Sequence, residues 1–581
     1  MNDTPLRRFY VRAVGLGLLG VLGSIYVALI GIVERFEPRE IVTGYLTLGL
    51  LTPALVVLVV AYRATEPPRT WGAAPPSRIH VVGAALLAGL IGAAGTAAFL
   101  VLNRAAPLDA VLVNANEQMS LILGLGLEFP AGALALLGAG LGLGAVAAAL
   151  RLLAPRIRGP LIAALVAVLL ASLMEPFMRV VLLQLGQAGI AGFFYQSGGL
   201  SVAGAIIVFA VVLAIGLASS FRGDAVRERV DALPGDQRRG IQIGLFVVGI
   251  VFLLILPQVI GSFLSEVVGT VGLYILMGLG LNIVVGYAGL LDLGYVAFFA
   301  IGAYATAILT SPVSVLGWGL SFWVAIPIVL VVAAISGLLI GAPVLRLRGD
   351  YLAIVTLGIG EIVRILLLSD ALRPWTGGAQ GILQVPPPEF ADIDFFQPQS
   401  LYYPILAFVV LGAFVAVSLA NSRVGRAWNA MREDEDVAAA TGINITNYKL
   451  LAFSLGAAFG CIAGAFLAVK LGSIFPHSLN LLVSITVLSL IILGGMGSIP
   501  GVIVGAFVLV GLPELLREFA EYRLLIYGMV LIGMMLWRPE GLIPSAQRRR
   551  ELQSTDEDEQ WTQATGPPGP GGMPVVERPS T

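Results

Sequence analysis

The chain has 581 residues, of which 58% are hydrophobic and 12% charged, and its mean hydropathy is +0.93. A soluble domain of this size cannot hide that much apolar surface, so we expect a polytopic membrane protein. The formal net charge of -1 gives no general attraction for nucleic acid, and the single cysteine, Cys461, excludes an intramolecular disulfide and a multi-cysteine metal site. Long continuous apolar runs favour helices over the alternating strands of a barrel.

The first half contains about six apolar runs long enough to cross a bilayer, which takes roughly 20 residues. The predicted spans lie near residues 11–33, 41–62, 80–102, 130–150, 159–184 and 198–220. Arginines gather in alternate connections, at 7–12, 63–78, 151–158 and 222–229. The positive-inside bias places these connections, and the N-terminus, in the cytoplasm. No cleavable signal peptide is evident, and we expect residues 1–220 to form an accessory membrane domain of about six helices.

Residues 221–240 are charged, contain Pro234-Gly235, and form the predicted cytoplasmic linker to a second membrane domain at 241–545. About ten further spans are predicted in this second domain. The expected fold is therefore an all-α membrane helix bundle of about 16 spans, six in the first domain and ten in the second. They lie near 241–262, 267–286, 289–310, 322–345, 351–369, 402–420, 449–470, 481–496, 500–513 and 523–537. The short segments at 481–513 are compatible with half-helices that enter and leave on one side. Residues 546–581 have too few apolar side chains to fold and are predicted to be a disordered cytoplasmic tail.

A charged segment at residues 421–449 interrupts the apolar runs and cannot lie in lipid. Its part from Gly425 to Thr441 is helix-prone and is stopped by Gly442. It is either a solvated loop whose arginines set the topology or an amphipathic helix that docks in a groove of a soluble partner. Composition alone favours the solvated loop.

Five blocks between about residues 270 and 544 resemble, in the same order, the LivM-type permease of branched-chain amino acid ABC importers. They are GLGLNIVVGYAGLLDLGYVAFFAIGAYATAIL (278–309), RLRGDYLAIVTLGIGEIVRILL (346–367), TGGAQGI (376–382), SRVGRAWNAMREDEDVAAATGINITNYKLLAF (422–453) and SITVLSLIILGGMGSIPGVIVGA (484–506), followed by LPELLR (512–517) and RPEGLIP (538–544). The chain departs from the family pattern at Asp292, Tyr295 and Ala379-Gln380. The resemblance therefore specifies the transport class more closely than the substrate.

The resemblance implies a permease subunit for branched-chain or related amino acids in a bacterial inner membrane, with no enzymatic activity, cofactor or metal of its own. The implied partners are two cytoplasmic ATPase subunits, a second permease subunit, an extracytoplasmic substrate-binding protein and the lipid bilayer. The chain has no P-loop motif, so ATP hydrolysis is expected on separate chains. In the family the fourth block looks like the segment that touches the ATPases, which implies coupling roles for Gly425, Arg426, Arg432, Glu433, Asp434, Glu435 and Gly442.

Polar residues within the spans are candidates for the translocation path, because an ionisable group at membrane depth normally faces a cavity or a partner. The candidates are Asn282, Asp292, Tyr295, Glu361 and Thr376. Asp292 either lines the path or caps the helix that follows it. Asn282 either bonds between helices or faces the path, and nothing local decides.

Two pairs at helical spacing, Glu361 with Arg364 and Glu175 with Arg179, are interpreted first as structural ion pairs and second as path-lining groups. Glycines at 456, 460 and 464 stand four apart, which predicts close packing with a neighbouring helix.

Three other functions compete with this one. Some proteins similar to this family import urea or short amides by the same mechanism. An ion-coupled secondary transporter would use Asp292, Glu361 or Glu175 for its coupling ion and would leave the charged segment unexplained. A membrane scaffold or sensor is favoured only by residues 1–230, which match no motif. A fused second permease is disfavoured, because the first half lacks a copy of the coupling block.

Overall fold

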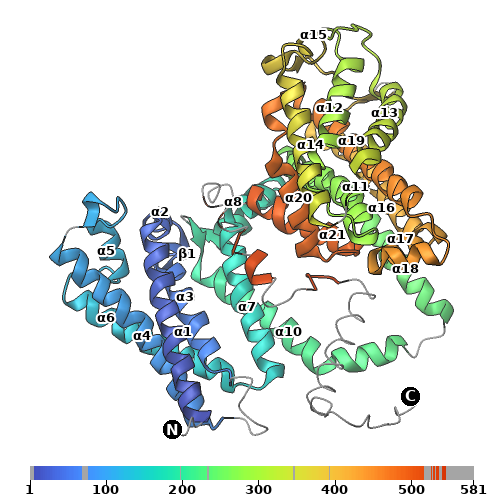
Figure 1. The fold of residues 1–581 in the computed structure, drawn as a ribbon. Coiled ribbons are helices and arrows are strands. Elements are labelled where there is room, and N and C mark those ends of the chain that lie inside the picture. The colour runs from blue at the N-terminus through green and yellow to red at the C-terminus, as the bar shows by residue number, and fades with distance from the viewer. Residues whose placement is uncertain are drawn as a thin grey trace, which may run out of the picture. The chain divides into compact units, whose positions relative to one another are not determined.

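The computed structural model describes residues 5–67, 76–106, 108–196, 198–231, 235–344, 347, 349–390 and 393–515, then 522, 525, 528–529, 531–534 and 540–544. Most of the predicted span at 523–537, and all of the predicted tail at 546–581, fall outside these residues. In the described part, 11 helices are long and apolar enough to cross a membrane, and the shorter apolar helices are Leu48–Ala64, Val296–Thr310 and Ile499–Glu514. The chain is an all-α, multi-pass membrane bundle with a few short strands (Figure 1).

The chain divides into two compact units, Met1–Ile250 and Val251–Thr581. The domain limits of 1–220, 221–240 and 241–545, the total of about 16 spans and the cytoplasmic N-terminus all stay predictions. Helix α10 (Val202–Asp231) and helix α11 (Gly235–Leu281) together extend through most of the predicted linker.

The N-terminal unit contains two groups of helices. In the first group, α1 (Pro5–Leu29), α3 (Leu48–Ala64), α4 (Arg78–Ala105) and α6 (Ala131–Leu152) pack on one another. In the second, α7 (Pro155–Leu173) packs along α10. Four short helices complete the unit: α2 (Ile32–Arg35), α5 (Glu117–Leu123), α8 (Glu175–Gln184) and α9 (Ala188–Phe194). The single span predicted at 159–184 is wrong, because α7 ends at Leu173 and α8 begins separately at Glu175, with proline in its first turn.

A small sheet joins the two helix groups at one end of the N-terminal unit. Its strand order is β2-β1-β4-β3, with β1 (Glu40–Val42), β2 (Leu46–Thr47), β3 (Tyr195–Gln196) and β4 (Gly199–Leu200). Strand β1 pairs antiparallel with β2 and parallel with β4, where Val42 lies opposite Leu200. Residues from the two groups, far apart in sequence, are therefore held together by backbone hydrogen bonds.

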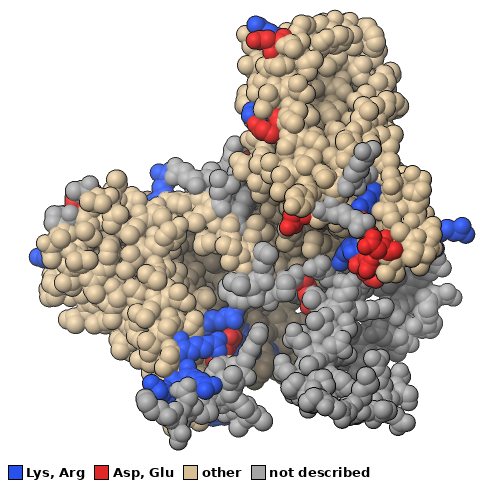
Figure 2. All heavy atoms as spheres, viewed as in Figure 1, with Lys and Arg blue, Asp and Glu red and all other residues tan. Residues whose placement is uncertain are grey.

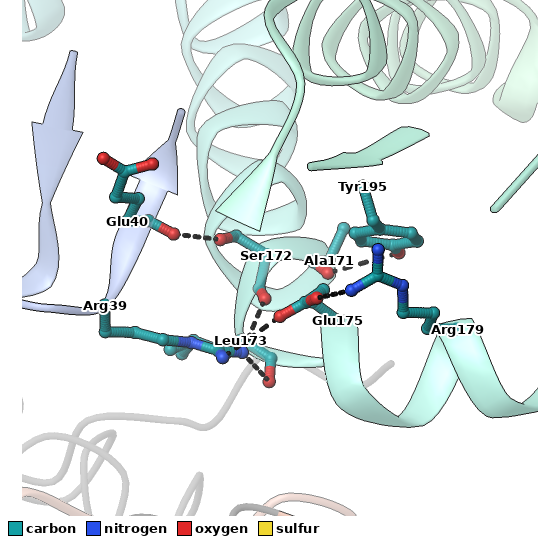
Figure 3. Close-up of polar contacts among 8 residues, drawn as sticks. All are labelled: Arg39, Glu40, Ala171, Ser172, Leu173, Glu175, Arg179 and Tyr195. Carbon is teal, nitrogen blue, oxygen red and sulfur yellow. Dashed lines mark hydrogen bonds and ion pairs between the residues drawn. The ribbon is translucent and has the colours of Figure 1, made fainter. Parts of the chain in front are cut away.

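A buried ion cluster lies beside this sheet (Figure 3). The two carboxylate oxygens of Glu175 accept from Arg39 at 3.1 Å and from Arg179 at 3.2 Å. The predicted pair of Glu175 and Arg179 is confirmed, and Arg39 is an addition. Arg39 also donates to the carbonyl oxygens of Ser172 and Leu173, in the last turn of α7, where carbonyls lack helical partners. Burial and the Glu175 carboxylate raise the pKa of Tyr195, so its hydroxyl stays neutral and donates to Ala171.

The C-terminal unit is built around α19 (Ile445–Leu471). Helices α12 (Val296–Thr310) and α13 (Phe322–Val344) pack along it. Around them lie α14 (Asp350–Leu368), α16 (Pro398–Ala420), α20 (Leu481–Gly494), α21 (Ile499–Ala506), and the short α15 (Arg373–Thr376) and α22 (Leu512–Leu515). Helix α11 is bent at Gly261, whose φ is 76°, near the end of the predicted span 241–262 and ahead of the span predicted at 267–286. Two strand pairs complete the unit, namely β5 (Ile382–Leu383) with β8 (Ser473–Ile474), and β6 (Glu389–Phe390) with β7 (Ile393–Asp394).

The predicted close packing of the α19 glycines is confirmed. A methyl group at Gly464 would lie 2.0 Å from the carbonyl oxygen of Phe299 on α12. At Gly456 it would lie 2.7 Å from the Val284 side chain, and at Gly460 it would lie 3.1 Å from that of Phe298. Backbone from another element therefore passes directly against this face of α19.

Candidate coupling site and translocation path

The most polar buried feature of the C-terminal unit is a break between two helices. Helix α11 runs into a π-helical turn, Asn282–Tyr287, and the chain then leaves helical geometry until α12 begins at Val296. The predicted span at 289–310 therefore starts later than expected. Asp292 lies in this break and accepts a hydrogen bond from the Gly294 amide at 2.8 Å. This bond forms a local turn ahead of α12 and does not cap that helix, whose N-cap residue is Tyr295.

Three other parts of the chain pack closely against the break at its glycine residues. A methyl group at Gly286 would lie 2.7 Å from the Gly497 nitrogen in the α20–α21 turn. At Gly294 it would lie 1.8 Å from the carbonyl oxygen of Thr356 on α14, and at Gly289 it would lie 2.8 Å from the Arg432 side chain. The Thr356 hydroxyl also accepts from the Leu293 amide at 3.0 Å. The break is thus in contact with α14, with the α20–α21 turn and with the charged segment.

Two polar side chains in this region are buried and incompletely satisfied. Asn282 accepts from the Gly497 amide at 2.8 Å, but its amide nitrogen makes no hydrogen bond to any described residue. The second carboxylate oxygen of Asp292 is likewise without a partner among these residues. An unsatisfied buried polar group costs about 1–3 kcal/mol, so such groups call for a functional explanation.

The charged segment is helical, as its sequence from Gly425 to Thr441 predicts, but it forms two helices separated at Asp434 instead of one. Helix α17 (Arg423–Glu433) is capped by the Ser422 hydroxyl, and α18 (Glu435–Ala440) is capped by the Asp434 carboxylate. Helix α17 is amphipathic, and its Trp428 is fully buried and donates to the Tyr448 carbonyl oxygen at the start of α19 at 2.9 Å. The segment ends at Gly442, whose φ of 90° is the left-handed conformation that glycine adopts readily.

Arg432 connects α17 to the break. Its guanidinium donates to the Gly286 carbonyl oxygen at 2.8 Å, and its side-chain stem lies against Gly289. A carbonyl in or beside a π-helical turn is poorly placed for a regular helical hydrogen bond, and a guanidinium is a strong donor to it. Arg432 therefore links α17 directly to the break.

The seven predicted coupling residues divide into two sets. One set faces the interior of the unit and comprises Gly425, Arg432 and Glu435. A methyl group at Gly425 would lie 2.3 Å from the Ala420 carbonyl oxygen. Glu435 pairs with the buried Lys449 at 2.5 Å. The other four are exposed, and they are Arg426, Glu433, Asp434 and Gly442. Figure 2 shows acidic side chains gathered over α17 and α18. Only the exposed set is available to a partner protein.

The remaining path candidates lie in different surroundings. Tyr295 is fully buried and donates to the Gly456 carbonyl oxygen at 2.7 Å, which joins it to α19. The Thr376 hydroxyl donates to the carbonyls of Leu367 and Leu372 and so secures the turn after α14. Glu361 pairs with Arg364 at 3.0 Å on a partly exposed face of α14, which confirms the predicted ion pair. Asn282, Asp292 and Tyr295 therefore belong to the break region, and Glu361 and Thr376 do not.

Two further residues at the break have no obvious sequence signal. Thr356 and Ser484 are small buried hydroxyls in apolar helices, and the Ser484 hydroxyl accepts from the Val296 amide at 2.8 Å. Their position inside two of the resembling blocks is the only signal that would have pointed to them. Among the described residues, no group of three or more His, Cys, Asp or Glu is placed to hold a metal ion.

Comparison with known proteins finds relatives of the C-terminal unit, the region that contains the break and the charged segment. Residues 263–536 match the family described as the branched-chain amino acid transport system permease component. Over 280 residues the chain is 42% identical to the high-affinity branched-chain amino acid transport system permease protein LivM of Salmonella typhimurium and, equally, to that of Escherichia coli. Each of these matches covers 44% of this chain and 64% of the relative.

More distant relatives share shorter or weaker matches. The permease protein LivH of Escherichia coli is 32% identical over 142 residues, which cover 24% of this chain and 45% of the relative. The probable LivM permease of Methanocaldococcus jannaschii is 26% identical over 242 residues, or 37% of this chain and 67% of the relative. No solved structure matches the chain. Residues 263–536, in the C-terminal unit of this membrane protein, are thus similar to the permease component of branched-chain amino acid transport systems, and the chain spans less than two thirds of the length of the LivM relatives that it matches.

Proposed function

We propose that the chain is the membrane permease subunit of an ABC importer for branched-chain or related amino acids in a bacterial inner membrane. It is a transport subunit, and ATP hydrolysis takes place on two cytoplasmic partner chains. The observation that carries the proposal is the hydrogen bond from Arg432 to Gly286, since it connects an exposed cytoplasmic helix to a buried polar break. The names of the relatives with 42% identity support the substrate class.

The coupling mechanism follows from the two sets of residues in the charged segment. The ATPases contact the exposed set, Arg426, Glu433, Asp434 and Gly442. Closure of the ATPases on ATP displaces α17 and α18 as a body, because Trp428 and the Glu435–Lys449 pair attach them to α19. Arg432 then moves the break, and the path changes from outward to inward access. ATP binding shifts this equilibrium to the extent that the ATPases bind one state more tightly.

The substrate path passes Asn282 and Asp292. Both side chains keep an unsatisfied polar atom in the buried break, and a hydrated ligand supplies the missing partners. The Asp292 carboxylate accepts a hydrogen bond from the substrate ammonium group, and the Asn282 amide nitrogen donates to its carboxylate. An extracytoplasmic binding protein delivers the amino acid to the other end of this path.

The second permease subunit docks on the face of α14 that carries Glu361 and Arg364. An ion pair at membrane depth is costly against lipid and normally faces protein or water. The Glu361 side chain is 43% exposed within this chain, so another chain or an aqueous path must cover it. Large apolar residues surround it on the same helix, among them Ile354, Ile362 and Ile365.

Two alternatives share part of the same geometry. An importer of urea or short amides would use the same coupling helices with a different set of groups at the break. An ion-coupled secondary transporter is favoured by one observation, the buried Asp292 in a broken helix. That mechanism gives no role to the exposed face of α17 and α18.

The test combines uptake with recovery of partners. The chain is expressed in its native membrane, labelled leucine uptake is measured, and partners are identified after purification in mild detergent. We expect ATP-dependent uptake that unlabelled isoleucine and valine inhibit and urea does not, together with co-purified P-loop ATPases. The double charge reversal Arg426→Glu with Glu433→Arg should abolish ATPase recovery, and the control Asp370→Lys, which is exposed beyond the far end of α14, should leave it unchanged. Uptake that persists without any ATPase would favour the secondary transporter, and inhibition by urea would favour the amide importer.

A further inference from the structure

The N-terminal unit contains an apolar groove that the proposed transport function does not use. It has a volume of about 770 Å³ and lies between the two helix groups. Leu51 and Leu55 of α3 line one wall, and Val166 of α7 and Ile206 of α10 line the other. The β1–β2 hairpin closes one end, where the Arg39–Glu175 cluster attaches α7 and α8 to β1. At its other end lie Tyr62 and Arg63.

The length and lining of the groove suit an acyl chain. From Leu51 to Arg63 it runs about 18 Å along α3, at 1.5 Å per residue. This is close to the depth of one leaflet, which is half of the roughly 30 Å hydrocarbon core of a bilayer. Its lining is apolar over this length.

The charge at the open end specifies a headgroup. Arg12, Arg63 and Arg151, from α1, α3 and α6, all reach the single carboxylate of Glu66, at 3.8, 3.2 and 3.9 Å. Arg151 also lies over the ring of Tyr62. Figure 2 shows Lys and Arg side chains gathered at this end of the unit, where α1 begins. Among the described residues, the helix ends and connections at this end contain eight arginines: 7, 8, 12, 63, 78, 151, 156 and 158.

We propose that this groove binds an anionic phospholipid, with an acyl chain between α3 and the α7–α10 pair and the phosphate at Arg63. The apolar walls exclude a polar ligand, and the basic end favours an anionic headgroup over a zwitterionic one. The positive-inside bias places that end at the cytoplasmic leaflet, whose surface is negative. The N-terminal unit is then a lipid-binding module. This inference does not depend on the transport substrate.

The test is lipid binding by the full chain in detergent, measured by native mass spectrometry with dioleoyl phosphatidylglycerol and dioleoyl phosphatidylcholine. We expect one phosphatidylglycerol to bind with at least fivefold preference. Ile206→Trp fills the groove and should lower its occupancy at least fivefold. Ile215→Trp is the matched control, because Ile215 lies on the same helix outside the groove lining and is 64% exposed, against 62% for Ile206. Equal binding by the two tryptophan variants would overturn the groove as the site.

A second pair of variants tests the headgroup. Arg63→Gln should remove the preference for phosphatidylglycerol and retain weak phosphatidylcholine binding, whereas Arg104→Gln, at the opposite end of α4, should leave the preference intact. Equal affinity of the wild type for the two lipids would overturn the anionic headgroup. A membrane protein that co-purifies with the wild type and is lost in Ile206→Trp would show that a partner chain occupies the groove, and would also overturn the proposal.

Discussion

Helix α19 of the C-terminal unit and the α7–α10 pair of the N-terminal unit differ in how deeply they are buried. In the most apolar stretch of α19, 61% of the residues are buried, whereas the corresponding shares for α7 and α10 are 17% and 11%. Helix α19 is surrounded by backbone that approaches its glycines, and α7 and α10 leave an apolar groove beside α3. Close packing transmits displacement, and an open arrangement accommodates lipid. Substitutions in the two units should therefore separate loss of transport from loss of stability.

The largest effect is expected in the N-terminal unit. Glu175→Gln leaves Arg39 and Arg179 facing a neutral amide in a buried site, which should cost about 3 kcal/mol of unfolding free energy. Thermal unfolding of the detergent-purified chain measures this loss. Leucine uptake per folded molecule should stay unchanged. The control Glu117→Gln, exposed on α5, should alter neither quantity. Uptake that falls in proportion to stability would break the proposed separation of the units.

A single methyl group compares the packing of the two units directly. Gly464→Ala places its Cβ 2.0 Å from the Phe299 carbonyl oxygen, so α12 and α19 must move apart at a cost of about 1–3 kcal/mol. Gly142→Ala on α6 meets open space and should be neutral, or stabilising by up to about 1 kcal/mol. Thermal unfolding and uptake are measured together. We expect Gly464→Ala to lose both, and equal behaviour of the two variants would contradict the difference in packing.

The Glu435–Lys449 pair tests how the coupling helices are attached. Glu435→Gln leaves the buried Lys449 ammonium without its carboxylate, and partial exposure of Glu435 limits the cost to about 1–2 kcal/mol. Uptake should fall several-fold, while ATPase subunits still co-purify. The double variant Glu435→Gln with Lys449→Met should recover stability, because no unpaired charge remains. Asp370→Asn, exposed beyond the end of α14, is the control; a loss there as large as that of Glu435→Gln would contradict a specific role for the pair.

Tyr295→Phe should have the smallest effect of the four. It removes the hydrogen bond to the Gly456 carbonyl, worth about 1 kcal/mol, and keeps the aromatic packing. Uptake should change less than twofold if Tyr295 serves packing, and Tyr351→Phe, exposed on α14, should be neutral in stability. A tenfold loss of uptake with normal unfolding would return Tyr295 to the translocation path.

Local patterns in the sequence predicted the features that depend on short-range spacing. Glu175 with Arg179, Glu361 with Arg364, the glycines of α19 and the helical charged segment all follow from helical periodicity, and the structure contains each of them. The apolar composition likewise predicted the helical membrane bundle.

Features that depend on long-range contacts were not predictable in this way. Arg39 lies 136 residues before its partner Glu175, and Arg432 lies 146 residues after Gly286. Hydropathy does not delimit the non-helical residues 288–295, because four of the eight are alanine or leucine. Which charged residues of the segment at 421–449 face solvent depends on how α17 is rotated about its own axis against α19. The buried side chains Trp428 and Met431 set that rotation.

The most direct test of the account is the number of ATP molecules hydrolysed per leucine transported by the reconstituted complex carrying Arg432→Ala. Arg423→Ala, exposed on the same helix, is the control. Loss of the Arg432–Gly286 hydrogen bond should uncouple the two processes, so that the ratio rises at least tenfold while ATPase recovery stays normal and the control behaves as wild type. An unchanged ratio in Arg432→Ala would contradict the claim that this side chain links the cytoplasmic helix to the translocation path.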